Sequence, residues 1–209
     1  MPSNKKLLQA AAGNAGESLY VEDVFSTNVY TGNGSTQTIT NGIDLAGEGG
    51  LVWTKRRSGS LNHFLVTTDI ATNQYLSTDL TSASGTTTTL LTPASDGFAF
   101  SSNTLVNANT ASQVAWTFRK AEKFFDVVTY TGTGSERTVS HNLGAVPRIM
   151  IIKKTNGTGG WWVYSKDWVD ANSGSLGVAL NLSNGDAGLT GYDTDFFWGA
   201  NPTDSVFSV

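Results

Sequence analysis

An internal repeat limits the folds open to this chain more than any other feature of its sequence. The segment Tyr30–Ser35 (YTGNGS) recurs as Tyr130–Ser135 (YTGTGS), and residues 38–39 (Thr-Ile) recur as residues 138–139 (Thr-Val). Self-similarity of this kind indicates one supersecondary unit used more than once. We therefore expect two related units in the chain.

Two longer segments extend the repeat in the same order. LVWTKR at 51–56 aligns with IMIIKK at 149–154, and HFLVTTD at 63–69 aligns with WWVYSKD at 161–167, both at an offset of 98 residues. The apolar run, the charged end and the final Asp all coincide. Agreement at separated places with similar spacing favours a true duplication over chance.

The ends of the two units also correspond, which sets the expected domain boundaries. SDGFAF at 95–100 resembles DSVFSV at 204–209. We predict an N-terminal arm at 1–19, a first β module at 20–125 and a second β module at 126–209.

Both units consist of short apolar runs bounded by Gly, Pro or charge, such as GGLVWTKRR and PRIMIIKK. Runs of this length between turn signals predict antiparallel strands. The glycines of TGNGS and TGTGS suit a tight hairpin turn, where a positive φ is needed. The predicted fold class is all-β: two tandem antiparallel β-sandwich modules, jelly-roll-like, preceded by a short helix.

The second unit is expected to be incomplete. The first unit continues past Phe100 to SQVAWTF, whose alternation is that of a final strand, whereas the second has no counterpart before Val209. A sheet that lacks a strand exposes unpaired backbone groups. We therefore expect either a longer native chain or a neighbouring subunit that supplies the strand.

The N-terminal segment NKKLLQAAAG predicts a short helix that Ser3 can cap and Gly13 can end. A helix of about ten residues is not stable alone in water. It is therefore either a frayed terminus or an arm that docks on a neighbouring subunit or larger particle. The candidate anchor residues are Lys5, Lys6, Leu7, Leu8 and Ala11.

Composition excludes several classes of partner. The formal net charge of −4 argues against a nucleic-acid binder. The absence of cysteine removes disulfides, thiolate metal sites and a Cys nucleophile. No apolar stretch approaches the roughly 20 residues that span a bilayer, so no membrane insertion is expected. Gln9 interrupts the only segment that mimics a signal peptide, so the protein is not expected to be secreted.

No catalytic or metal site is predicted, and no cofactor. The histidines His63 and His141 are not accompanied by a nucleophile elbow, G-x-S-x-G. The carboxylates follow turn-forming residues, where Asp commonly stabilises a turn. Oxygen ligands at 184–188 and 193–195 do not have the spacing of a calcium loop.

Aromatic residues concentrate in the second unit. Within WWVY at 161–164, successive side chains of a strand point to opposite faces, so these rings cannot all lie in one core. Core packing, a subunit or tail interface, and a glycan-stacking platform all remain open. The candidate glycan- or interface-binding residues are Trp161, Trp162, Tyr164, Trp168, Tyr192 and Trp198.

Several stretches resemble virion proteins of tailed bacteriophages, especially fibre-like or tail-associated proteins of marine and cyanobacterial phages. They are NKKLLQAAAG, the run from Tyr20 to Arg57, WTFRKAEKFFDVVTYTG, and HNLGAVPRIMIIKK with the WWVY that follows. The resemblance covers nearly the whole chain. It implies a structural component of the virion tail, made in the host cytoplasm: a tail-fibre subunit, often a homotrimer, whose N-terminal end attaches to tail adaptor, nozzle or baseplate proteins.

Three functions are therefore considered. The first is a virion structural protein, a tail-fibre subunit without enzymatic activity that serves host attachment. The second is a carbohydrate-binding module that recognises host surface glycans through the aromatics of the second unit. The third is a glycan depolymerase, which requires two carboxyl groups facing each other across the substrate bond.

Overall fold

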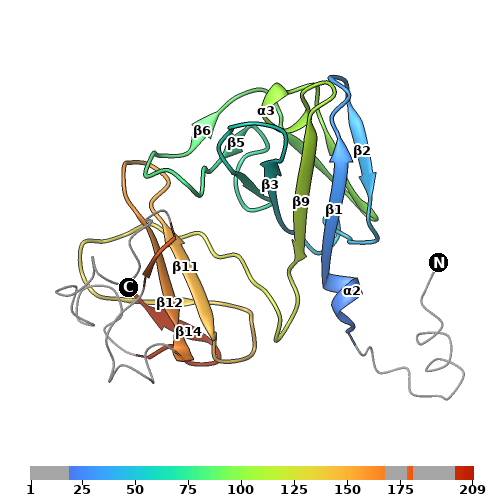
Figure 1. The fold of residues 1–209 in the computed structure, drawn as a ribbon. Helices are drawn as coiled ribbons and strands as arrows, with labels where there is room; N and C mark the ends of the chain where they lie inside the picture. Colours follow the sequence, from blue (N-terminus) through green and yellow to red (C-terminus); the bar gives the residue numbers. More distant parts are fainter. Residues whose placement is uncertain (1–18, 168–177, 181–200) are drawn as a thin grey trace, which may run out of the picture.

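Antiparallel β-strands are the main regular elements of the protein, joined by long turns and loops (Figure 1). The computed structural model describes residues 19–167, 178–180 and 201–209, so the helix predicted near the N-terminus lies outside the described residues. The predicted all-β sandwich class is confirmed. A difference from the sequence prediction is α2 (Val21–Val24), a single helical turn that begins where the Asp23 carboxylate accepts a hydrogen bond from the Tyr20 N–H.

One layer of the first module is a four-stranded antiparallel sheet in the order β1-β9-β3-β4. The strand predicted from SQVAWTF is present as β9. It does not close the sheet from outside, because it lies between β1 and β3 and pairs with both. The strands are β1 (Phe25–Thr31), β3 (Gly50–Arg56), β4 (Phe64–Thr67) and β9 (Ser112–Arg119).

The second layer is a three-stranded sheet in the order β2-β8-β7. A short strand pair, β5-β6, lies in the connection from β4 to β7, and a one-turn helix, α3 (Thr104–Asn107), precedes β9. The strands are β2 (Gln37–Thr40), β5 (Gln74–Tyr75), β6 (Gly85–Thr86), β7 (Leu91–Ala94) and β8 (Gly97–Phe100).

The core of the first module fills the space between these two layers. Alternate residues of each strand point inward, so Val52 of β3 is 1% exposed and Ala115 of β9 is fully buried. Phe98 of β8 faces them and is also fully buried. The core consists of Tyr30, Ile39, Ile43, Leu45, Val52, Phe64, Val66, Leu90, Leu91, Phe98, Phe100, Val106 and Ala115.

The second module has fewer described strands and a smaller core. One layer is the pair β10-β14, and the other is the sheet β11-β12-β13. The buried residues of its core cluster are Val139, Tyr164 and Phe207. The strands are β10 (Thr138–Ser140), β11 (Ile149–Lys153), β12 (Trp161–Ser165), β13 (Val178–Ala179) and β14 (Val206–Ser208).

The pair β2-β8 of the first module corresponds in register to β10-β14 of the second. Ile39 lies opposite Phe98 in the first module, and Val139 lies opposite Phe207 in the second. Phe98 aligns with Phe207 when segment 95–100 is matched with segment 204–209 in the sequence. The repeat in the sequence is therefore also a repeat in strand pairing.

The hairpins β3-β4 and β11-β12 agree in the same way. Leu51 pairs with Thr67, and Ile149, 98 residues later, pairs with Ser165, the counterpart of Thr67 at the same offset. Every further pair of β3-β4 has its counterpart in β11-β12. One register therefore serves both hairpins although few of their side chains are identical.

A hydrogen bond from a side chain to the backbone also recurs. The Gln37 side chain donates to the Thr31 carbonyl at 3.2 Å, and Arg137 donates to the Thr131 carbonyl at the same distance. The tight turns correspond too, because Gly34 and Gly134 have φ values of 70° and 77°. A side chain other than glycine would be strained in either turn.

In its described residues the second module lacks counterparts of several strands of the first, including β1, β7 and β9. In the described part of the chain, no strand of the second module takes the place that β9 has in the first. The segment 127–131, which corresponds to β1, is not a strand and makes no backbone-backbone hydrogen bond with the described residues. The domain boundaries proposed from the sequence stay a prediction.

Candidate interaction site

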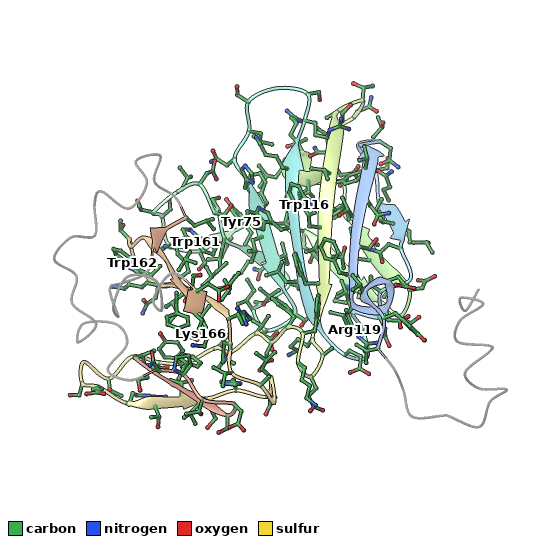
Figure 2. The ribbon with its side chains drawn as sticks, turned by 60° about the horizontal axis from the view of Figure 1, so that its bottom comes forward. Tyr75, Trp116, Arg119, Trp161, Trp162 and Lys166 are labelled. Atoms are coloured by element: carbon green, nitrogen blue, oxygen red, sulfur yellow. The ribbon has the colours of Figure 1, made fainter. Side chains whose placement is uncertain are left out.

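Three of the six candidate aromatic residues lie on β12, and the strand separates them onto two faces. Trp161 and Tyr164 are each 3% exposed, and Trp162 is half-buried. Figure 2 shows Trp161 directed toward the first module and Trp162 on the other side of β12. The other three, Trp168, Tyr192 and Trp198, lie outside the described residues, as do the anchor candidates Lys5, Lys6, Leu7, Leu8 and Ala11.

Trp161 joins the two modules. Its ring packs in a buried cluster with Leu65 and Leu76 of the first module. Its indole N–H lies 3.0 Å from the carbonyl oxygen of Ser77 and 3.1 Å from that of Leu80. A buried tryptophan whose N–H is satisfied in this way is a structural contact, and it offers no ring face to a sugar.

Further polar contacts attach the same loop of the first module to the second. Lys153 donates from Nζ to the Thr81 carbonyl at 3.1 Å, and the Gly159 N–H donates to that carbonyl at 2.9 Å. The Ser84 N–H donates to the Thr155 carbonyl at 2.8 Å. The loop from Leu76 to Ser84 is thus the part of the first module that receives β11, β12 and their connection.

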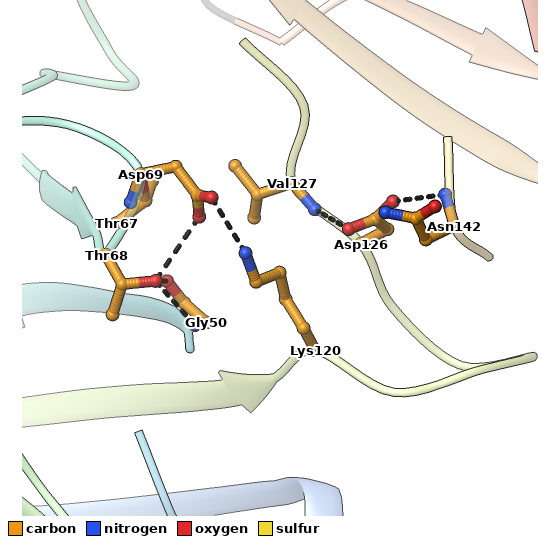
Figure 3. Close-up of polar contacts among 8 residues, drawn as sticks. All are labelled: Gly50, Thr67, Thr68, Asp69, Lys120, Asp126, Val127 and Asn142. Carbon is orange, nitrogen blue, oxygen red and sulfur yellow. Dashed lines mark hydrogen bonds and ion pairs between the residues drawn. The ribbon is translucent and has the colours of Figure 1, made fainter. Parts of the chain in front are cut away.

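The chain segment that links the modules is held by two carboxylates (Figure 3). Lys120 donates from Nζ to Asp69 Oδ1 at 2.7 Å, and both side chains are about three-quarters buried. The Asp126 carboxylate accepts hydrogen bonds at 2.8 Å from the N–H groups of Val127 and Asn142. The first contact fixes the end of β9, and the second fixes the start of the second module.

Tyr164 belongs to the core of the second module, where it packs with Val139 and Phe207. Trp162, two residues earlier on the same face of β12, lies opposite Ile152 of β11. Of the predicted aromatic candidates within the described residues, Trp162 alone therefore presents a substantial part of its ring to the surface.

An aromatic pair that the sequence did not reveal lies on the outer face of the four-stranded sheet. Trp53 of β3 and Trp116 of β9 are directly opposite each other, with ring centroids 5.9 Å apart at 66°. Both are half-buried (Trp116 is labelled in Figure 2). The alternation of LVWTKR and SQVAWTF gives each ring an outward position. That β9 would lie beside β3 is not evident from either segment.

Polar residues adjoin this pair. The Trp53 indole N–H donates to His63 Nδ1 at 3.2 Å, and the His63 N–H donates to the Asp79 carboxylate. Partial burial lowers the pKa of His63. The negative charge of Asp79 opposes this lowering, and the positive charge of Lys55 adds to it. A shallow depression of about 540 Å³ lies next to His63 and is lined by Lys55, Gly59, Ser60, Leu61, Asn62 and Asp79.

Large apolar side chains are exposed on strands of both modules. Val29 on β1 is 63% exposed, and Ile149 and Ile151 on β11 are 66% and 47% exposed. The counterparts of the two isoleucines in the first module, Leu51 and Trp53, are half-buried; both lie beside β9, and Leu51 also packs against the cluster of Leu65, Leu76 and Trp161. The absence of a neighbouring strand in the described residues thus contributes to the exposure on β11.

The histidines and metal-ligand candidates show structural roles where they are described. His141 is buried; its Nδ1 accepts from the Leu143 N–H at 3.2 Å, so Nε2 carries the proton and faces the Thr203 carbonyl. Asp167 pairs with Arg148. Within the described ranges no three His, Asp or Glu side chains are close enough to hold a metal ion. The oxygen-rich segments at 184–188 and 193–195 lie outside those ranges.

The described part of the chain contains no helix that is both long and apolar enough to cross a membrane. A family model described as a domain of unknown function, DUF7483, matches residues 21–209. No curated protein and no solved structure matches the chain. The match covers both modules, so their function has to be argued from their own residues.

Proposed function

The chain belongs to the DUF7483 family, and from its own residues we propose that it is a virion structural protein: a tail-fibre subunit of a tailed bacteriophage that assembles into a homotrimer. In this role the protein has no enzymatic activity. Its location is the virion tail, and its tail-proximal end attaches to adaptor, nozzle or baseplate proteins.

The observation that carries the proposal is the exposure of large apolar side chains on regular strands. Val29, Ile149 and Ile151 are each about half or more exposed, although both modules bury other apolar residues efficiently. Ile149 and Ile151 lie on the same face of β11, and adjoining exposed apolar residues suit a surface that another chain covers. An assembling subunit accounts for these residues better than an isolated monomer does.

The virion setting is supported by the sequence resemblance to phage fibre-like proteins and not by the geometry of the modules. The N-terminal residues Lys5, Lys6, Leu7, Leu8 and Ala11 are the proposed anchor. A structural role is also consistent with the surroundings of His63 and His141, whose ring nitrogens are used in hydrogen bonds to neighbouring protein groups.

The mass of the protein in solution tests the assembly. We expect light scattering to give a trimer, and Val29→Asp to shift it toward monomer because a charge would be buried in the contact. Thr38→Asp, at an exposed polar position of β2, is the matched control and should leave the mass unchanged. A monomer at every concentration, with the wild-type chain folded, would contradict assembly.

The virion role has its own test. Mass spectrometry of purified particles of the virus that encodes the chain should detect it, and gold-labelled antibody should mark the tail. Particles that carry no copy of the protein would exclude the role whatever the oligomeric state.

A second candidate function, carbohydrate binding, is favoured by one arrangement. The half-buried rings of Trp53 and Trp116 lie beside a polar depression lined by Lys55, Asn62 and Asp79. Aromatic faces next to hydrogen-bonding groups suit sugar rings. A glycan array with wild type, Trp53→Ala and Trp162→Ala distinguishes the two aromatic surfaces, and no binding by the wild type would dismiss this function.

A further inference from the structure

The edge of β11 that faces away from β12 has no strand beside it in the described part of the chain; we refer to it as the open edge. The corresponding edge of β3 is paired with β9 along the whole of β3, from Gly50 to Arg56. The open edge is therefore one place where the second module differs from the first.

The backbone groups that face the open edge can be identified. The Lys166 N–H donates to the Arg148 carbonyl at 2.8 Å, so Arg148 bonds toward the β12 side. Backbone groups of successive residues in a strand point to opposite edges. The N–H and C=O groups of Ile149, Ile151 and Lys153 therefore face the open edge.

The apolar part of the open edge lacks the features that natural proteins use to prevent strand pairing. Such edges usually contain proline, charged side chains such as lysine, or a bulge. Within β11 only the last residue, Lys153, is of this kind, and the four residues before it, Ile149–Ile152, are all apolar. Ile149 and Ile151 are also exposed by 66% and 47%, so apolar surface and backbone groups are available together.

The segment that would lie on the other side of an added strand is unpaired as well. Residues 127–131 correspond to 27–31 of β1, which pair with β9 in the first module. In the second module they make no backbone-backbone hydrogen bond with the described residues. By the repeat, β11 and residues 127–131 are the counterparts of the two neighbours of β9, and in the described residues neither has the backbone hydrogen bonds that β9 provides in the first module.

We propose that the open edge binds an extended segment donated by a partner protein. The segment pairs antiparallel with β11 in the register that β9 has with β3, and residues 127–131 then pair with its other edge. Addition of a strand to an exposed sheet edge is an established mode of peptide recognition. The inference does not depend on the proposed virion role.

The first module specifies the chemistry of the donor. Phe118 and Trp116 lie opposite Leu51 and Trp53, so bulky apolar residues are expected opposite Ile149 and Ile151. The residue between them is Thr117, and the next inward one, Ala115, is fully buried. By the repeat, the position of Ala115 falls between Val128 and Ile152, which calls for a small apolar residue there.

The donor is not a described strand of a second copy. A strand in the position of β9 must have both of its edges free, as β9 pairs with β1 on one side and β3 on the other. Each described strand already pairs with a neighbour within its own chain. A second copy's β11, for example, keeps β12 on one edge and could not also pair with residues 127–131.

A labelled peptide with the sequence of residues 111–120 tests the proposal on the full chain, because it contains β9. We expect saturable binding by fluorescence anisotropy. Ile151→Pro removes an N–H that faces the open edge and should weaken binding by about tenfold or more. Ile151→Ala keeps the N–H and should weaken binding by only about threefold.

A second pair of probes keeps the protein unchanged, in case Ile151→Pro fails to fold. In β9 the Trp116 N–H faces β3 and the Thr117 N–H faces β1. Methylation of the peptide nitrogen at Trp116 should abolish pairing with β11, whereas methylation at Thr117 should preserve it. Hydrogen exchange should slow on binding at Ile149, Ile151 and Lys153 and at residues 127–131.

Three results would overturn the proposal. The first is the absence of saturable binding. The second is binding that is equally strong after methylation at Trp116 and at Thr117. The third is self-pairing: if Ile151→Pro dissociates an oligomer and the peptide does not compete with it, the open edge belongs to a second copy of the chain.

Discussion

The two modules share two strand pairs with the same register, β2-β8 with β10-β14 and β3-β4 with β11-β12, but in the described residues only the first has the strand that completes the larger sheet. In the first, β9 lies between β1 and β3 and contributes Ala115 to the core. In the second, some core positions have counterparts in the equivalent strand pairs, such as Val139 for Ile39, Phe207 for Phe98 and Tyr164 for Val66. The register of these strand pairs is thus the same in both modules although their side chains differ. The core of the first module is larger and includes a residue from its central strand.

The equivalent tyrosines illustrate the difference. Tyr30 is 8% exposed, and its hydroxyl donates to the Val106 carbonyl at 2.7 Å. Val106 lies on α3, in the connection that leads to β9. Tyr130 is less buried, and its hydroxyl makes no hydrogen bond with the described residues. Completion of the sheet therefore also provides the tyrosine with its acceptor.

The largest expected difference concerns the two core phenylalanines. Phe98→Ala should cost about 4 kcal/mol because the ring is fully buried and packs on Phe100. Phe207→Ala should cost about 3 kcal/mol, at the low end of the range, because its core is smaller and more open. Urea unfolding followed by circular dichroism measures both. Equal costs for the two variants, or a larger cost for Phe207→Ala, would contradict the expected difference between the two cores.

Proline on the two equivalent strands separates a paired edge from an open one. Leu51→Pro removes an N–H that bonds to β9 and should cost about 3 kcal/mol. Ile149→Pro, at the matched position, removes an N–H that faces the open edge and should cost about 1 kcal/mol or less. The Leu51→Ala and Ile149→Ala variants correct for the lost side chains in the same urea titrations. Similar losses for the two prolines would show that β11 has a partner strand.

Removing the hydroxyl groups of the two tyrosines should give a smaller contrast. Tyr30→Phe deletes the hydrogen bond to Val106 and leaves a buried carbonyl, so a loss of about 1 kcal/mol is expected. Tyr130→Phe should change the free energy of unfolding by less than about 0.5 kcal/mol. Thermal unfolding of the two variants beside wild type checks the difference, and a larger loss for Tyr130→Phe would refute it.

Alkaline titration measures the difference in burial between the same two tyrosines through their pKa values. Burial raises the pKa of Tyr30 well above its usual range and raises that of Tyr130 against the opposing charge of Arg137. An unfolded tyrosine ionises near pH 10, so the stability from both neutral phenols is complete below about pH 10 and is lost as pH rises further. Absorbance at the phenolate band in Tyr30→Phe and Tyr130→Phe should show that Tyr130 ionises first.

The sequence predicted the repeat, the all-β class and the strand SQVAWTF because apolar periodicity and turn glycines are local signals. It also predicted that the rings of WWVY would divide between two faces, as Trp161 and Tyr164 do. It did not predict that Trp161 would pack on the first module. That contact depends on where the Leu76–Ser84 loop lies, and the loop has no periodic pattern.

The Trp53-Trp116 pair was missed for a related reason. Each ring can be assigned to an outward position of its own strand, but their contact requires β9 to lie between β1 and β3. Strand order is a non-local property that alternation within one strand does not determine. The residues at 168–177 and 181–200, which include three aromatic candidates, lie outside the described part.

Residue-resolved hydrogen exchange on the isolated chain tests the central difference between the modules most directly. We predict slow exchange at Leu51, Trp53 and Lys55, whose N–H groups bond to β9. Exchange at Ile149, Ile151 and Lys153 should be faster by about two orders of magnitude or more, since their N–H groups face the open edge. Equal protection of the two sets would contradict the account, because it would mean that β11 already has a strand on that edge.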